Sequence, residues 1–169
     1  MNLFASTFDP RKQRPPLPVL RSAPPVLRPT PPPSTPELAA DRGAALAAAY
    51  RRHGGLASSD EVLRLMRPHA DQAISRLARW IVTRRAISFT WHSCTFLPMF
   101  QFERADMSLK RAPNAIACEL RAAFDEWDLA WWFVQPNSWL QDAAPIERIA
   151  ADPESVLQAA RADRFIALG

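Results

Sequence analysis

Proline sets the first limit on what this chain folds into, because it is concentrated at one end of the sequence. Eleven of the 17 prolines lie in residues 1–36, and the segment 10–36 reads PRKQRPPLPVLRSAPPVLRPTPPPSTP. Proline fixes φ and lacks an N–H donor, so neither a helix nor a central strand persists at this density. We predict a disordered, partly polyproline arm over residues 1–35, and we interpret it as a solvated tail in preference to a ligand for a proline-recognising domain.

The net charge of +4 also belongs to this arm. Of the 21 basic and 17 acidic residues, five basic and one acidic lie in residues 1–35, which leaves 16 of each sign in the rest of the chain. The part expected to fold is therefore neutral overall, and the arm would add a weak attraction to nucleic acid. A hydrophobic content of 48 %, with six Trp and nine Phe, is enough to close a core.

The residue types that common enzymes require are scattered. The chain has only four glycines, so it lacks the clustered glycines of a Walker loop or a dinucleotide fingerprint. Its three histidines do not have the spacing of zinc ligands, and no G-x-S-x-G occurs. His92 and Cys94 are expected to share one face of a strand, which we interpret as ordinary strand surface and not as a catalytic pair. We expect a binding protein with no catalytic residue, metal or cofactor.

The same composition predicts a cytoplasmic protein. The longest strongly apolar stretch is Leu129–Val134, far shorter than a membrane span, and the first residues contain no apolar run of signal-peptide length. Cys94 and Cys118 lie in unlike contexts, one in an expected strand and one in an expected helix. We interpret both as reduced thiols, and we expect no membrane partner.

Start and stop signals after the arm predict a mainly α-helical fold. Thr35 is a good N-cap for an alanine-rich helix that would end at the Gly54-Gly55 pair. Ser58 and Glu61 form a capping-box pattern that begins a short second helix. A further helical pattern runs over about 70–84, so the sequence predicts two helices joined by a tight turn.

The period of the pattern changes after this pair of helices. Ile87–His92 alternates in the manner of a half-buried strand, and the apolar run Phe96–Phe102 is expected to return beside it as a small β-hairpin. Helices are then predicted from Pro113, over Trp127–Phe133 and from Asp152.

The tryptophans of the segment 127–133 differ in their expected environment. Trp127 and Trp131 are four residues apart and share a helix face, where packing in the core is the ordinary outcome. Trp132 is rotated about 100° away from that face. We therefore predict a core position for Trp131 and an interface position for Trp132.

Two segments of the sequence resemble a known family. The stretch EWDLAWWFVQPNSWLQDAAPIERIAADPESVLQAARADRF resembles the toxin-binding domain of the Xre/MbcA/ParS antitoxins, with a Trp-bearing helix, an Asn, a Leu, a Pro-aliphatic pair and a final helix. Gln141 and Asp142 stand where that family usually has a glycine. The upstream pieces DEVLRLM, QAIS, RRAISF and Pro98–Phe102 are similar to the helix-turn-helix-like half that precedes this domain in many members.

This resemblance implies a helical bundle with two functional parts. Residues 36–110 would form a helical unit with a helix-turn-helix-like element and the hairpin, and residues 111–169 would form the toxin-binding domain. The protein would be the antitoxin of a type II toxin–antitoxin system. Its partner would be a RES-type toxin that consumes NAD or ADP-ribosylates, and its last helix and tail would occlude the active site of that toxin. The expected toxin contacts are Trp132, Asn137, Trp139, Leu140, Arg161, Arg164, Phe165 and Gly169.

The upstream unit leaves a second interpretation open. Arg76 and Arg79 are three residues apart on the second helix of the expected pair, and Arg84 and Arg85 follow it. These four arginines would contact operator DNA, either as autoregulation by the antitoxin or as the main task of a transcriptional regulator without a toxin. A solvated helix surface explains them equally well. A homodimer or a larger toxin–antitoxin complex would suit either function, and a scaffold that recruits partners through the arm is a third alternative.

Overall fold

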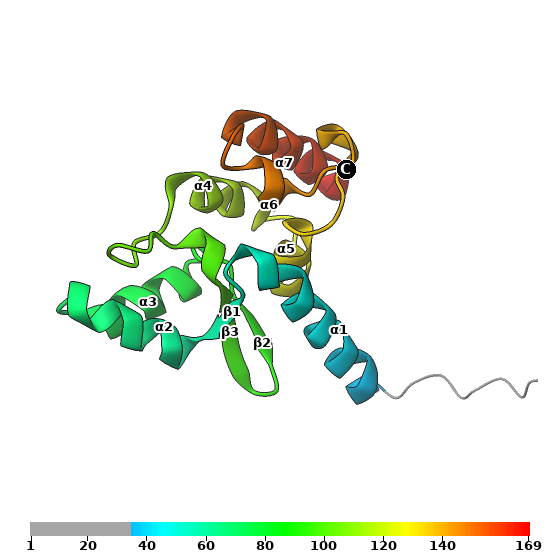
Figure 1. The fold of residues 1–169 in the computed structure, drawn as a ribbon. Coiled ribbons are helices and arrows are strands. Elements are labelled where there is room, and N and C mark those ends of the chain that lie inside the picture. The colour runs from blue at the N-terminus through cyan, green and yellow to red at the C-terminus, as the bar shows by residue number, and fades with distance from the viewer. Residues whose placement is uncertain (1–34) are drawn as a thin grey trace, which may run out of the picture. The chain divides into compact units, whose positions relative to one another are not determined.

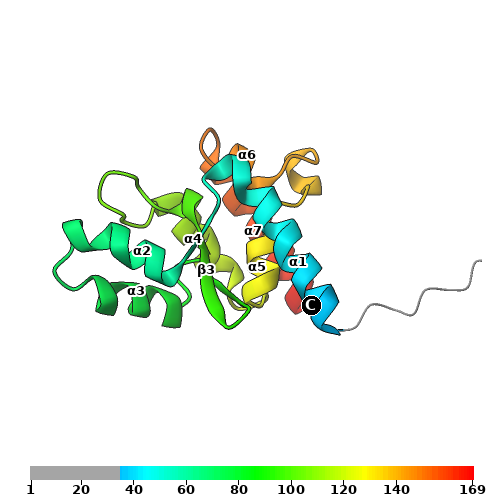
Figure 2. The same ribbon diagram turned by 60° about the horizontal axis from the view of Figure 1, so that its bottom comes forward.

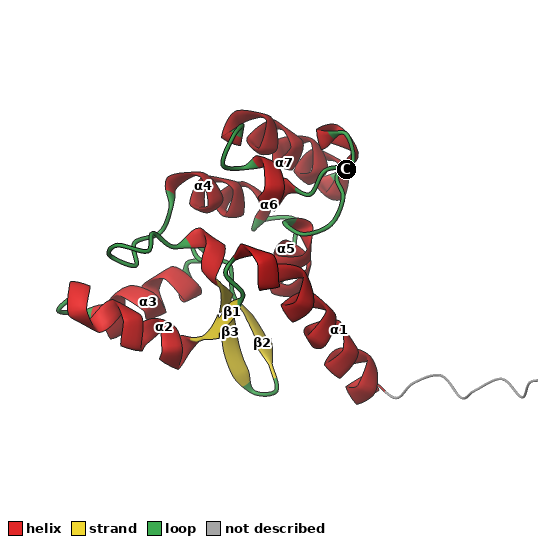
Figure 3. Ribbon diagram, in the orientation of Figure 1, coloured by secondary structure: helices red, strands yellow, loops and turns green. Residues whose placement is uncertain are grey.

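The computed structural model describes residues 35–169, which are mostly helical (Figures 1 and 3). The predicted arm lies outside the described residues except for its last residue, Thr35. The α-helices are α1 (Thr35–Tyr50), α2 (Ser59–Met66), α3 (Ala73–Val82), α4 (Arg111–Leu120), α5 (Glu126–Trp132), α6 (Pro145–Arg148) and α7 (Pro153–Leu168). The strands are β1 (Leu56–Ser58), β2 (Phe89–Trp91) and β3 (Cys94–Pro98).

Two of the helix starts that the sequence signals predict, at Ser58 and at Asp152, are confirmed. The helices predicted from about residue 70 and from Pro113 begin at Ala73 and Arg111. The Ser58 hydroxyl accepts from the Glu61 N–H at 3.3 Å, and the Glu61 carboxylate accepts from the Ser58 N–H at 2.7 Å, so the capping box forms. Asp152 caps α7 by accepting from the Ser155 N–H at 3.0 Å. These hydrogen bonds lower the pKa values of the Glu61 and Asp152 carboxyls.

The predicted hairpin is present, and it belongs to a larger sheet. β2 and β3 are antiparallel, and β1 adds to the other side of β3 in the order β1-β3-β2. β1 has only three residues, which is too short for the alternation that identifies strands in a sequence. The return strand is also shorter than predicted, because β3 ends at Pro98 and a 3₁₀ turn, Met99–Gln101, follows.

The hairpin turn corrects the expected relation between His92 and Cys94. His92 and Ser93 have φ values of 48° and 61°, so they are the two central residues of a turn between the paired Trp91 and Cys94. His92 is thus a turn residue, and it does not share a strand face with Cys94. The prediction failed because this left-handed turn forms without the glycine or asparagine that usually marks it.

The sheet separates two hydrophobic clusters. Side chains alternate across a strand, so Phe89 and its partner Phe96 face one cluster, whereas Leu97 and its partner Ala57 face the other. The second cluster lies among α2, α3 and the loop after η3 (Met99–Gln101). The first cluster joins α1 to α4, α5, α6 and α7, so residues from both sides of position 110 share it (Figure 2).

Within residues 35–169, no helix combines the length and the apolar character needed to cross a membrane.

Candidate functional site

The last helix, α7, supplies most of the residues predicted to bind a partner. Its inner face buries Val156, Ala159 and Ala160 against the first cluster, and it packs on α4 and α6 (Figure 1). Small residues on this face allow the helices to approach closely. The opposite face and the last turn of α7 remain available to solvent.

Asp163 is the polar centre that fastens α7 to the loop after α5. Its carboxylate accepts hydrogen bonds from Trp132 Nε1 and Asn137 Nδ2, both at 2.7 Å, and from Trp139 Nε1 at 3.0 Å. Asn137 in turn accepts from the Trp139 N–H at 2.9 Å, which shapes the turn. The sequence interpretation missed Asp163, because an acid on a helix surface carries no signal of partners 24 to 31 residues away.

A second polar contact fastens the same helix to α4. Glu119 lies 2.6 Å from Arg164 Nη1 and 3.8 Å from Arg161 Nε. The Arg161 and Arg164 side chains keep 48 % and 43 % of their surface exposed, respectively, whereas Glu119 keeps 20 %. Both predicted toxin contacts are therefore held in place within the chain and still present part of each guanidinium to solvent.

Large apolar side chains are exposed next to these contacts. Phe165 and Leu168 follow Arg161 and Arg164 at the i, i+3, i+4, i+7 spacing of a single helix face. Ile166 lies three residues after Asp163, to which Trp139 is bonded. Phe165 and Leu168 thus lie on the side of α7 that carries Arg161 and Arg164, whereas Ile166 and Trp139 lie nearer Asp163. We call these four apolar side chains around the end of α7 the end patch; their exposed fractions are Trp139 57 %, Phe165 75 %, Ile166 65 % and Leu168 59 %.

The tryptophan prediction is wrong in its assignment of core and surface. Trp132 is only 7 % exposed, with its ring edge-on to Phe133 at 5.1 Å, whereas Trp131 is half-buried. α5 is seven residues long, and the face that carries Trp127 and Trp131 is covered incompletely. The periodicity correctly placed Trp127 and Trp131 on one face of α5, but it did not show which neighbouring elements would cover that face.

The other predicted toxin contacts separate into two groups. Asn137 and Leu140 are buried with Trp132, so they support the surface from beneath. The exposed members are Trp139, Arg161, Phe165 and Gly169, together with the half-buried Arg164.

The four arginines predicted to contact DNA also differ. Arg84 is not a free cation, because it donates to the Arg121 and Phe124 carbonyls, both at 2.6 Å. It is half-buried, so its assignment as a DNA contact is corrected to a structural one. Arg76 lies over the Trp80 ring at 5.0 Å. Arg76, Arg79 and Arg85 are exposed and line a surface depression of about 400 Å³.

The ionisable groups with shifted pKa values have structural explanations. Burial raises the pKa of Tyr50, whose hydroxyl donates to the Ala130 carbonyl at 2.6 Å. Hydrogen bonds from Ser108 lower the pKa of Asp106 in a tight turn. In the described part of the chain, no three His, Cys, Asp or Glu side chains gather as metal ligands would.

The chain was also compared with known proteins. No protein-family model matches the sequence. The searches of curated proteins and of solved structures gave no match either.

Proposed function

We propose that this protein is an antitoxin that binds and inhibits a RES-type toxin through the end patch. The observation that carries the proposal is the exposure of four large apolar side chains on and beside the last turns of α7. Exposed large apolar side chains gathered at one end of a molecule are typical of protein interfaces, where aromatic residues are enriched and Trp often contributes much of the binding energy.

The attachment of α7 supports the same proposal. The Asp163 and Glu119 contacts hold the helix on two sides, so the end patch is presented on an ordered scaffold. Binding through an ordered helix avoids much of the entropy cost of folding a segment on contact. A helix that lays an apolar face into a groove is a recurrent mode of recognition.

The loop after α5 supports the resemblance on which the partner is proposed. Gln141 and Asp142 occupy the place where the Xre/MbcA/ParS antitoxins usually have a glycine, and both have φ values of 60°. This is the left-handed region that favours glycine. The backbone geometry expected of the family's loop is therefore compatible with this chain although the residues differ.

In the proposed mechanism, the end patch enters the cleft of the toxin and excludes NAD by occupying its place. Phe165 and Ile166 would fill apolar space, and Arg161 and Arg164 would contact the rim. The protein would need no catalytic group, since inhibition would depend only on the stoichiometric complex.

Complex formation with the product of the adjacent gene tests this proposal. We expect Ile166→Ser combined with Phe165→Ser to abolish co-purification of the two proteins, because the apolar anchors are removed. Ile74→Ser is the matched control, since Ile74 is 63 % exposed and Ile166 is 65 % exposed, both on helices. Equal retention of the complex by both variants, with unchanged circular dichroism, would refute binding through the end patch.

A DNA-binding role is the second candidate function, either for autoregulation or without a toxin. It is favoured by the depression on α3 that Arg76, Arg79 and Arg85 line. Arg76→Gln with Arg79→Gln should reduce the slope of log affinity against log salt by about two, because two phosphate contacts are lost. Arg67→Gln is the control. An unchanged slope would refute phosphate binding by this helix.

A further inference from the structure

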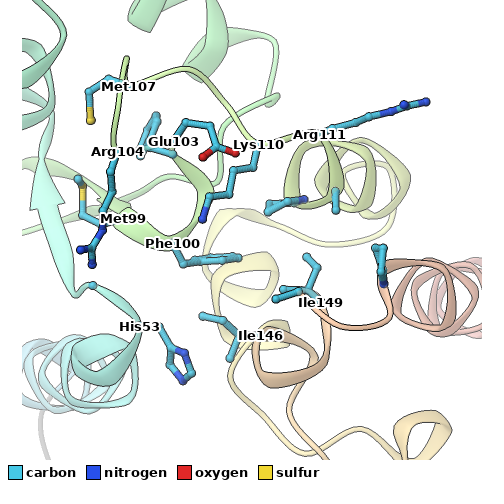
Figure 4. Close-up of a pocket in the computed structure, with 16 residues that line it drawn as sticks. His53, Met99, Phe100, Glu103, Arg104, Met107, Lys110, Arg111, Ile146 and Ile149 are labelled. Atoms are coloured by element: carbon cyan, nitrogen blue, oxygen red, sulfur yellow. The ribbon is translucent and has the colours of Figure 1, made fainter.

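A separate pocket is bordered by residues of both hydrophobic clusters. Its volume is about 660 Å³, which is within the range of small-molecule sites. Three parts of the chain line it: the end of η1 (Arg51–His53), the segment from Met99 to α4, and the junction of α6 with α7 (Figure 4). No predicted toxin or DNA contact lines the pocket.

The floor of the pocket is apolar and comes from both hydrophobic clusters. Ile146 and Ile149 belong to the first cluster, and Met107 belongs to the second. Phe100 lies between them and is held by Tyr50 at 5.8 Å and by Phe133 at 5.2 Å, measured between ring centroids. This packing fixes the position of the Phe100 ring, so the apolar floor is preformed.

The rim of the pocket is cationic. Arg104, Lys110 and Arg111 line it, against the single carboxylate of Glu103. In Figure 4 the Lys110 amino group points toward Phe100, the Arg104 guanidinium ends beside Met99, and Arg111 points away. Within the described part of the chain, none of the three cations forms an ion pair. Among residues 35–169, Lys110 and Arg104 thus border the apolar floor without an ion-pair partner.

We infer that this pocket binds a small amphipathic anion: a carboxylate with an apolar chain. The chain of such a ligand would cover Phe100, Ile146 and Ile149, and its carboxylate would accept from Lys110 and Arg104. An apolar body with one polar end matches the division of this pocket into floor and rim. Charge-assisted hydrogen bonds at the rim would then orient the ligand.

Isothermal titration calorimetry of octanoate binding to the full chain tests this inference. Octanoate is expected to bind at least tenfold more tightly than octanol, because only the carboxylate uses the rim. Lys110→Met should weaken octanoate binding about tenfold and leave octanol binding unchanged. Arg67→Met, which removes an exposed cation that does not line the pocket, is the control and should change neither affinity.

A second variant locates the ligand within the pocket. Ala150 is an exposed residue of the lining, so Ala150→Trp fills the pocket without replacing a core side chain. This variant should abolish octanoate binding and retain the circular dichroism of the parent protein. The inference is overturned if octanoate does not bind, if octanol binds equally well, or if AMP or inorganic phosphate binds and octanoate does not. It is also overturned if Ala150→Trp binds octanoate normally.

Discussion

Gly43 shows how one residue is determined by a contact that is distant in sequence. It lies in the middle of α1, where glycine is ordinarily less favourable than alanine by about 1 kcal/mol. A Cβ atom at Gly43 would overlap the indole ring of Trp91, so α1 and the hairpin approach each other closely only because residue 43 has no side chain.

Gly43→Ala is therefore expected to lower the free energy of unfolding by about 1–3 kcal/mol, as overpacking does. Urea denaturation measures the change. In a Trp91→Leu background the same substitution should be neutral or stabilising, because the clash is absent. Destabilisation of equal size in both backgrounds would contradict the proposed contact.

Tyr50 makes the stability of the fold depend on pH in the alkaline range. Burial raises its pKa, so the neutral phenol is favoured in the folded state, whereas an unfolded tyrosine ionises near about pH 10. Its contribution to stability is present below that pH and is lost as the pH rises toward the folded-state pKa. The free energy of unfolding should begin to fall near about pH 10 and keep falling as the pH rises further.

Tyr50→Phe is expected to lack this alkaline loss, although it is less stable at neutral pH because it loses the bond to Ala130. Tyr50 is the only tyrosine, so tyrosinate absorbance reports it directly. Ionisation of the folded protein near about pH 10 would show that the phenol is not buried.

Asp163 concentrates three hydrogen bonds in one carboxylate. Asp163→Asn replaces one acceptor oxygen with an NH₂ group that cannot accept from the indole or amide donors. We expect a loss of roughly 1–3 kcal/mol in the free energy of unfolding and a change in near-ultraviolet circular dichroism from the tryptophans. Asp71→Asn, on an exposed turn, is the control, and an equal loss in both variants would deny the central role of Asp163.

Among the elements, α3 and α4 are joined at their C-terminal ends by two arginines, each of which donates to a carbonyl at the end of the other helix. Arg84 donates to the Arg121 carbonyl, and Arg121 donates to the Thr83 carbonyl at 2.8 Å. Carbonyls at the ends of helices lack partners within the helix, so these bonds satisfy groups that would otherwise depend on water.

Arg84→Met is expected to destabilise the fold by about 1–3 kcal/mol, whereas Arg85→Met should change stability little. Thermal unfolding of the two variants makes the comparison. If Arg84→Met leaves stability unchanged, the hydrogen bonds that Arg84 makes to α4 do not stabilise the fold.

Across the whole molecule, local sequence signals predicted the features that depend on contacts between residues close in sequence. The capping box at Ser58, the cap at Asp152 and the alternation before Trp91 were sufficient to locate their elements. The shared first cluster was not predictable in this way. It depends on Tyr50 meeting Ala130, 80 residues away.

The candidate site was predictable only in part for the same reason. The exposed Trp139 and Phe165 follow from the family resemblance, but Ile166, Leu168 and Asp163 did not enter the prediction. Their importance depends on how α7 is oriented against α4 and the loop after α5. One-dimensional spacing defines the faces of a helix but not the neighbours that cover them.

The most direct test of the central proposal is a titration of the toxin's NAD consumption with the full chain. We expect activity to fall in proportion to added protein and to vanish near one equivalent, because inhibition is by occlusion. The Phe165→Ser, Ile166→Ser variant should leave the activity intact at the same ratios. Full NAD consumption in the presence of a several-fold excess of the parent chain would contradict the antitoxin account.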